Sequence, residues 1–174
     1  MNRPLAILIG PPGAGKTTVA HALAERLGLS VRDTDEDIVA STGRTIADIF
    51  VDDGEAHFRE LEHAAVAQAL AEHVGVLALG GGAVLDPRTQ EALTGHTVIF
   101  LDVRITDAAR RVGFNRDRPL LLGNPRAQWT IMMDHRRPIY TQIATHRVAT
   151  DGLTPEEVTE AVLSALELKG SAVD

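Results

Sequence analysis

Residues 7–20 read ILIGPPGAGKTTVA, and this stretch decides the fold of the chain. The apolar residues up to Ile9 are typical of a buried strand, and from Thr17 onward apolar side chains recur with a helical period. Between them, residues 10–17 match the pattern G-x-x-x-x-G-K-[ST] in full. In such a loop, backbone amides surround phosphate oxygens and the helix N-terminus favours negative charge. The stretch therefore predicts a phosphate-binding loop between a strand and a helix.

This loop supplies most of the residues that we expect around a nucleotide, namely Gly13, Ala14, Gly15, Lys16, Thr17 and Thr18. The Lys16 ammonium can reach the β- and γ-phosphates, and the Thr17 hydroxyl can ligate Mg²⁺. The alternative is a glycine-rich turn that precedes a lysine by chance. A strand before the loop and a helix after it favour the nucleotide site.

The composition is that of one globular domain of 174 residues, with 44% apolar and 24% charged residues. A net charge of -7 argues against a nucleic-acid-binding surface. The chain has no cysteine, which excludes disulfides and thiolate zinc sites. No apolar run approaches the ~20 residues of a membrane helix, and the N-terminus does not resemble a signal peptide. We expect a soluble, cytoplasmic monomer that contacts neither nucleic acid nor membrane.

Short apolar runs alternate with amphipathic stretches along the chain. Strands are expected at 5–9, 29–33, 75–79, 97–102 and 146–150, with helices between them and after the last. This alternation predicts an α/β fold with a parallel sheet covered by helices on both faces. Because ligands bind beyond the carboxyl ends of such strands, we expect one functional edge that carries Gly10, Asp33, Gly80 and Asp102.

Two carboxylates end the second predicted strand, in the segment RDTDED (32–37). Asp33 and Asp35 are two residues apart, so in extended backbone both can face one cleft. One could hold Mg²⁺ through water, and the other could accept a proton from an attacking hydroxyl. The alternative is that these are simply acidic residues in the first turn of a helix, where the helix dipole favours negative charge, as it also would for Glu36 and Asp37. The neighbouring phosphate loop favours the functional interpretation.

Arg59 lies in FRELE (58–62), between apolar residues that are expected to face inward. Its spacing from Glu62 allows an i,i+3 ion pair on the helix surface. Its planar guanidinium could instead hold a carboxylate or a phosphate. The residues by themselves leave both roles open.

Three glycines, Gly80, Gly81 and Gly82, follow the buried strand predicted at 75–79. A simple turn does not need three glycines, and such positions are costly to order. They indicate that the backbone must approach a ligand closely.

Two arginines, Arg116 and Arg118, lie in residues 113–125, which read as a mobile loop. A charged lid that closes over a nucleotide would use such residues to neutralise charge on the transferring phosphoryl group. Both could also be solvated loop residues, and the apolar surroundings of Arg118 favour a function. Arg136 and Arg137 follow near the end of a predicted helix, where cations are favourable in any case.

Taken together, these segments resemble the shikimate kinase family over nearly the whole chain. The matching segments are GPPGAGKT (10–17), DTD (33–35), TGRTIADIF (42–50), GEAHFRELE (54–62), LGGGAV (79–84), RPLL (118–121) and RRPIY (136–140). The phosphate loop is common to many families, whereas the ordered combination is specific. The resemblance implies transfer of the ATP γ-phosphoryl group to the 3-hydroxyl of shikimate, in the pathway to chorismate and the aromatic amino acids.

For the acceptor, the resemblance implies that Asp35 binds the substrate hydroxyls and takes the proton. Arg59 and Arg136 would clamp the substrate carboxylate, and the backbone of residues 80–82 would approach the ring hydroxyls. We choose Arg136 over Arg137 because the family pattern places the arginine two residues before the proline.

For the nucleotide, the resemblance implies that Asp33 positions Mg²⁺ through water, together with Thr17. Lys16 and the lid residue Arg118 would contact the transferring phosphate, and Arg118 would also contact the substrate. Arg111 and Pro155 would flank the adenine.

The implied architecture is one kinase domain over residues 1–174, of the nucleoside-monophosphate-kinase type. The phosphate loop occupies 10–17, a substrate-binding region about 34–61, and a lid about 112–124. A gluconate kinase is the nearest alternative, because its acceptor is also a hydroxylated carboxylate. A nucleotide-binding switch without catalysis is a further alternative, but it has no need for Asp35 and both arginine sites.

Overall fold

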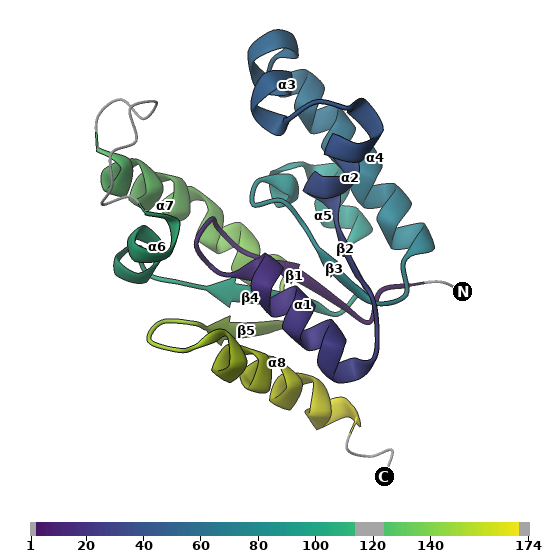
Figure 1. The fold of residues 1–174 in the computed structure, drawn as a ribbon, viewed down its shortest axis with the longest axis vertical. Coiled ribbons are helices and arrows are strands. Elements are labelled where there is room, and N and C mark those ends of the chain that lie inside the picture. Colours follow the sequence, from purple (N-terminus) through teal and green to yellow (C-terminus); the bar gives the residue numbers. More distant parts are fainter. Residues whose placement is uncertain (1–2, 114–123, 171–174) are drawn as a thin grey trace.

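A computed structural model describes residues 3–113 and 124–170 of the chain (Figure 1). Five strands form one sheet in the order β2-β3-β1-β4-β5, and every neighbouring pair is parallel. The strands are β1 (Ala6–Ile9), β2 (Val31–Asp33), β3 (Val76–Ala78), β4 (Val98–Asp102) and β5 (His146–Ala149). The predicted parallel sheet is confirmed.

Helices cover both faces of this sheet, as the alternating pattern predicts. They are α1 (Lys16–Leu27), α2 (Thr34–Thr42), α3 (Ile46–Asp53), α4 (Glu55–Glu72), the short 3₁₀ helix η1 (Ala83–Leu85), α5 (Pro87–Ala92), α6 (Ile105–Val112), α7 (Pro125–Ile143) and α8 (Pro155–Gly170). Helices α1 and α8 pack together on one face, and α5 and α7 lie on the other (Figure 1). Helices α2, α3 and α4 contact one another beside the β2 edge (Figure 1).

The central strand β1 is buried along its whole length, since none of its four side chains is more than 1% exposed. It lies between β3 and β4, so the phosphate loop that follows it starts from the middle of the core. A second, smaller apolar cluster joins α2, α3 and α4 through Ile38, Ile49 and Phe58. This cluster gives the region about 34–61 packing of its own beside the main core.

Local signals in the sequence set the ends of several elements. The Thr45 hydroxyl accepts a hydrogen bond from the Asp48 amide at 3.1 Å, as its spacing predicts. Strand β2 starts two residues later than predicted. The reason is that the Leu29 amide still bonds to the Ala24 carbonyl at 2.8 Å, beyond the Gly28 cap of α1.

Most of the predicted lid, about 112–124, lies outside the described residues, and so do Arg116 and Arg118. Within residues 3–113 and 124–170, no helix combines the length and the apolar character that crossing a membrane requires.

Candidate active site

The phosphate loop leaves β1 through glycines that other residues could not replace. Gly10 has a φ of +151°, and a Cβ there would lie 2.5 Å from the Leu101 carbonyl oxygen of the neighbouring strand. Gly13 has a φ of +90°, and its Cβ would lie 2.9 Å from the Ala108 Cα. The loop therefore passes between β4 and α6 with no room for side chains at these positions.

Beyond this loop lies a cavity of about 620 Å³ at the carboxyl ends of the strands. It is lined by residues 12–19 together with Asp33, Asp35, Leu79, Gly80, Gly81, Arg111, Val112, Leu153, Pro155 and Val158. All the nucleotide and metal residues predicted within the described part of the chain line this one cavity. Asp102, although at the same edge, is not among its lining residues.

Lys16 lies half-buried at the first residue of α1, with its ammonium turned back onto the loop. Its Nζ donates to the Gly10 carbonyl at 2.6 Å and to the Pro11 carbonyl at 3.3 Å. Burial lowers the pKa of Lys16 to about 8, and the cation of Arg136 acts in the same direction. The nearby carboxylates of Asp35 and Asp33 act in the opposite direction, without cancelling the effect of burial.

Above about pH 8, nucleotide binding should therefore be accompanied by protonation of Lys16. Below this pKa Lys16 is already charged, whereas above it a bound phosphate must raise the pKa and draw a proton from solution. Affinity for ADP should fall with rising pH between the free and the bound pKa. Calorimetry of ADP binding at about pH 9, in buffers of different ionisation enthalpy, should show net proton uptake, and at about pH 7 much less. Equal uptake at both pH values would contradict this assignment.

The paired carboxylates at the end of β2 serve a structural purpose and also face the cavity. Asp33 is the N-cap of α2, and its Oδ1 accepts the amides of Asp35 at 2.8 Å and of Glu36 at 3.3 Å. Burial raises the pKa of Asp35, and the neighbouring Asp33 charge adds to this, while Lys16 opposes it. A carboxylate with a raised pKa in a cleft suits proton transfer. Asp33 therefore caps α2, and both carboxylates also line the cavity.

Charged side chains of this protein lie close against the three glycines that follow β3. A Cβ on Gly80 would lie 2.6 Å from Asp35 Oδ1, and one on Gly82 would lie 2.7 Å from both Nη atoms of Arg59. A Cβ on Gly81 would lie 3.4 Å from Arg136 Nη1. None of the three has a positive φ, so their conformation does not demand glycine, and a side chain at Gly80 or Gly82 would instead displace these charged groups. The predicted acceptor-site residues themselves approach this backbone closely, and its approach to a ligand stays a prediction.

Arg59 is held from several sides. Its Nη1 donates to Glu62 Oε1 at 2.7 Å, and its guanidinium carbon lies 5.3 Å and 5.9 Å from the ring centroids of Phe58 and Phe50. Glu62 is only 3% exposed, and burial raises its pKa while the Arg59 hydrogen bond lowers it. The ion pair and a place beside the glycine loop therefore coexist. The sequence predicts the ion pair with Glu62 but not the burial of Glu62, because i,i+3 spacing does not reveal burial.

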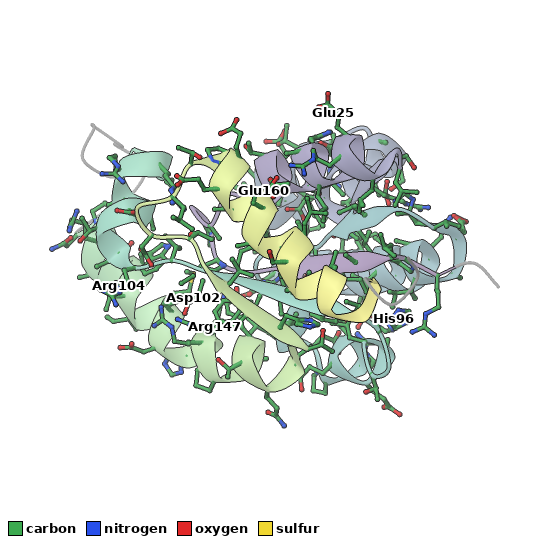
Figure 2. The ribbon with its side chains drawn as sticks, turned by 90° about the horizontal axis from the view of Figure 1, so that it is seen from below. Glu25, His96, Asp102, Arg104, Arg147 and Glu160 are labelled. Carbon is green, nitrogen blue, oxygen red and sulfur yellow. The ribbon has the colours of Figure 1, made fainter. Side chains whose placement is uncertain are left out.

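The two adjacent arginines of α7 point to different partners. Arg136 faces Gly81, whereas Arg137 Nη2 donates to Asp102 Oδ1 at 3.0 Å. Asp102 is 4% exposed and also binds Arg147 at 2.7 Å, and Figure 2 shows these two labelled side chains near each other. Arg137 therefore belongs to an ion-pair group around the buried Asp102 carboxylate, while Arg136 lies beside the predicted acceptor site.

Arg111 and Pro155 both line the cavity. Arg111 Nη1 donates to the Gly13 carbonyl and to the Thr150 hydroxyl, both at 3.0 Å. The guanidinium therefore joins the phosphate loop to the segment before α8. Its place is consistent with the predicted adenine contact, which stays a prediction.

The residues present fit a bound Mg²⁺. Thr17 and Asp33 both line the cavity, and they offer a hydroxyl and a carboxylate oxygen, the ligand type that Mg²⁺ prefers. Among the described residues, no group of three or more His, Asp or Glu side chains could hold a metal by itself. An ion held by Thr17 and Asp33 would take its remaining ligands from phosphates and water.

A parallel sheet with a phosphate loop after its central strand, and acidic and basic groups beyond the same edge, defines a P-loop kinase. The family model of shikimate kinase matches residues 12–167. The shikimate kinase of Streptomyces coelicolor is 59% identical over 169 residues, which are 97% of this chain and 99% of that protein. The chain therefore belongs to the shikimate kinase family, as its motifs predict.

Solved structures agree with this membership. The shikimate kinase from Acinetobacter baumannii in complex with shikimate matches with a TM-score of 0.87 at 32% identity, covering 99% of this chain and 95% of that one. The shikimate kinase from Aquifex aeolicus matches with a TM-score of 0.76 at 30% identity, covering 97% and 98%. The predicted nucleoside-monophosphate-kinase-like P-loop fold is confirmed.

Proposed function

We propose that this kinase transfers the γ-phosphoryl group of ATP to the 3-hydroxyl of shikimate, with Mg²⁺, giving shikimate 3-phosphate and ADP. The observation that carries the proposal is the glycine loop beside the phosphate loop, where Gly80, Gly81 and Gly82 seat Asp35, Arg136 and Arg59. One carboxylate and two guanidinium groups suit an acceptor with hydroxyls and a carboxylate. Membership of the family supports the same acceptor.

Asp35 would orient the acceptor hydroxyl and take its proton as the oxygen bonds to phosphorus. Lys16 would neutralise charge on the phosphoryl group while the bond to ADP breaks. Mg²⁺, held by Thr17 and through water by Asp33, would supply charge neutralisation at the phosphates. Phosphoryl transfer depends mainly on alignment and charge, which these side chains provide from fixed strand and helix ends.

Arg59 and Arg136 would clamp the acceptor carboxylate from two helices, α4 and α7. The ring contacts and the Glu62 bond restrict Arg59, so it loses little freedom on binding. The family resemblance assigns Arg118 to the transferring phosphate and Arg111 with Pro155 to the adenine, and both remain proposals.

A coupled assay of ADP release tests the function. Purified protein with Mg·ATP should release ADP rapidly with shikimate, and slowly with gluconate or with no acceptor. A rate with gluconate alone would overturn the proposed acceptor but keep the kinase. Tight nucleotide binding without turnover on either acceptor would favour a switch.

The adjacent arginines offer a matched pair of variants. Arg136→Met should raise the KM for shikimate by about 10- to 100-fold, because a charge-assisted hydrogen bond to the carboxylate is lost, and should leave the Tm unchanged. Arg137→Met should lower the Tm by about 2–4 °C, because buried Asp102 loses one partner, and should leave the KM within about twofold. Steady-state kinetics and thermal unfolding of both variants measure this. If Arg137→Met raised the KM and Arg136→Met lowered the Tm instead, the contact with the substrate carboxylate would belong to Arg137.

We further propose a cytoplasmic monomer with one domain over residues 1–174, which has a substrate-binding region about 34–61 and a lid about 112–124. The absence of cysteine from the sequence and the small core that joins α2, α3 and α4 support these assignments.

A further inference from the structure

The first four carbonyl groups of the phosphate loop, residues 10–13, are each held by a hydrogen-bond donor. The loop itself supplies the donors for the first two, through the Lys16 ammonium and the Ala14 amide. A loop that binds anions must keep its carbonyl oxygens away from them, since like charges repel. What holds the second pair of carbonyls therefore bears on phosphate binding.

Donors for the second pair come from distant helices. Trp129 Nε1 donates to the Pro12 carbonyl at 3.0 Å, from 117 residues further along the chain. Arg111 Nη1 donates to the Gly13 carbonyl at 3.0 Å. Trp129 is only 5% exposed, and its hydrogen bond to the Pro12 carbonyl is partly buried.

Fixing a carbonyl also fixes the amide across the same peptide bond. The peptide unit is planar and trans, so the Pro12 carbonyl and the Gly13 N–H point in opposite directions. When Trp129 holds that carbonyl, the direction of the Gly13 N–H is fixed as well, and Pro12 and Gly13 both line the cavity. The peptide plane is set before any anion arrives.

Helix α7, which carries Trp129, is anchored by buried side chains and by a contact with the glycine loop. Helix α7 has 19 residues, and Trp129, Met133 and Tyr140 are its buried side chains. At its far end the Tyr140 hydroxyl donates to the Gly81 carbonyl at 2.5 Å, and Arg136 lies beside the same glycine. One helix thus holds the nucleotide loop and the acceptor loop.

We propose that Trp129 is a positioning residue for the ATP phosphates, and that it acts by holding the Pro12–Gly13 peptide plane with its indole N–H. The proposal rests on the nucleotide site of the proposed function. Under this proposal the indole both packs in the hydrophobic core and positions the phosphate loop.

Two substitutions separate the N–H from the bulk of the indole. Trp129→Phe keeps a large ring but lacks a donor, and Trp129→His keeps a ring N–H but lacks the benzene portion. We expect Trp129→Phe to weaken Mg·ADP binding and raise the KM for ATP by about 3- to 10-fold, the worth of one neutral hydrogen bond. The KM for shikimate should stay within about twofold. Trp129→His, measured at about pH 8, should lower the Tm more but weaken Mg·ADP binding less.

Calorimetric binding of Mg·ADP, steady-state kinetics and thermal unfolding decide the outcome. Met133→Ala, a buried truncation on the same helix, serves as the control, with a lower Tm and an unchanged KM for ATP. The proposal is overturned if Trp129→Phe binds Mg·ADP like the unchanged protein, if both Trp129 variants lose affinity equally, or if every kinetic constant shifts alike.

A second measurement needs no variant. Trp129 is the only tryptophan, so a ¹⁵N spectrum holds a single indole N–H signal. This signal should exchange slowly with water and shift on titration with Mg·ADP, and fast exchange without a shift would overturn the proposal. If the unchanged protein binds Mg·ADP but does not phosphorylate shikimate, only the proposed function fails. If it phosphorylates shikimate and Trp129→Phe behaves normally, only the role of Trp129 fails.

Discussion

Asp35→Asn should reduce turnover with shikimate by about 10²- to 10⁴-fold while the protein still folds and binds nucleotide. The amide has the shape of the carboxylate, so it still fits against Gly80, but it cannot accept the hydroxyl proton. The pKa of Asp35 is raised, first by its burial, and a raised pKa suits a carboxylate that accepts a proton.

The nucleotide affinity of Asp35→Asn must be measured at a pH where Lys16 is charged. The Asp35 charge helps to keep Lys16 protonated, so its removal should lower the pKa of Lys16 further below about 8. Mg·ADP affinity should therefore be measured near pH 6.5, where Lys16 is charged in either protein. Glu36→Gln is the matched control, because it removes an exposed charge from the same turn of α2. Undiminished turnover in Asp35→Asn would remove Asp35 from the mechanism.

The fold could be predicted from the sequence because its signals are local. The alternation of apolar runs and helical periods defined the parallel sheet, and Gly10, Asp33 and Gly80 follow the strands at one edge as expected. Boundaries shifted where a helix cap extended past its glycine, as before β2. Such shifts arise from hydrogen bonds that periodicity does not encode.

The site was predictable only where a motif fixes spacing between neighbours in sequence. The phosphate loop and the pair Asp33 and Asp35 could be placed in this way. The burial of Glu62 and the contact of Trp129 with Pro12 could not be foreseen, since both depend on packing between distant segments. Without the family spacing, Arg136 could not be preferred over Arg137. Their different partners become visible only when β4 and α7 are placed together.

Gly80→Ala should reduce turnover by about 10²-fold with little loss of stability, the effect of moving a catalytic group by roughly 1 Å. An alanine is compatible with the backbone at Gly80, because φ there is not positive. Its Cβ would, however, lie 2.6 Å from Asp35 Oδ1 and 3.0 Å from Glu62 Oε2. These are ends of side chains, so the carboxylates move and the fold remains.

Gly75→Ala supplies the contrast for this variant. Its Cβ would lie 2.2 Å from the backbone oxygen of Ser30, before the first residues of β2 and β3, so it should lower the Tm without changing the kcat of folded protein. Loss of kcat in Gly75→Ala as large as in Gly80→Ala would mean that strain anywhere in the sheet disturbs the site.

A double variant separates two ways in which Gly80 could act. If Gly80→Ala acts by displacing Asp35, combining it with Asp35→Asn should reduce kcat/KM hardly further than Asp35→Asn alone, because the proton acceptor is already lost. If the backbone at Gly80 instead approaches the acceptor ring directly, the added methyl group should reduce kcat/KM by a similar factor in either background. Kinetics of the single and double variants on shikimate measure this difference. We expect the non-additive result, because the atom nearest to the added Cβ belongs to Asp35.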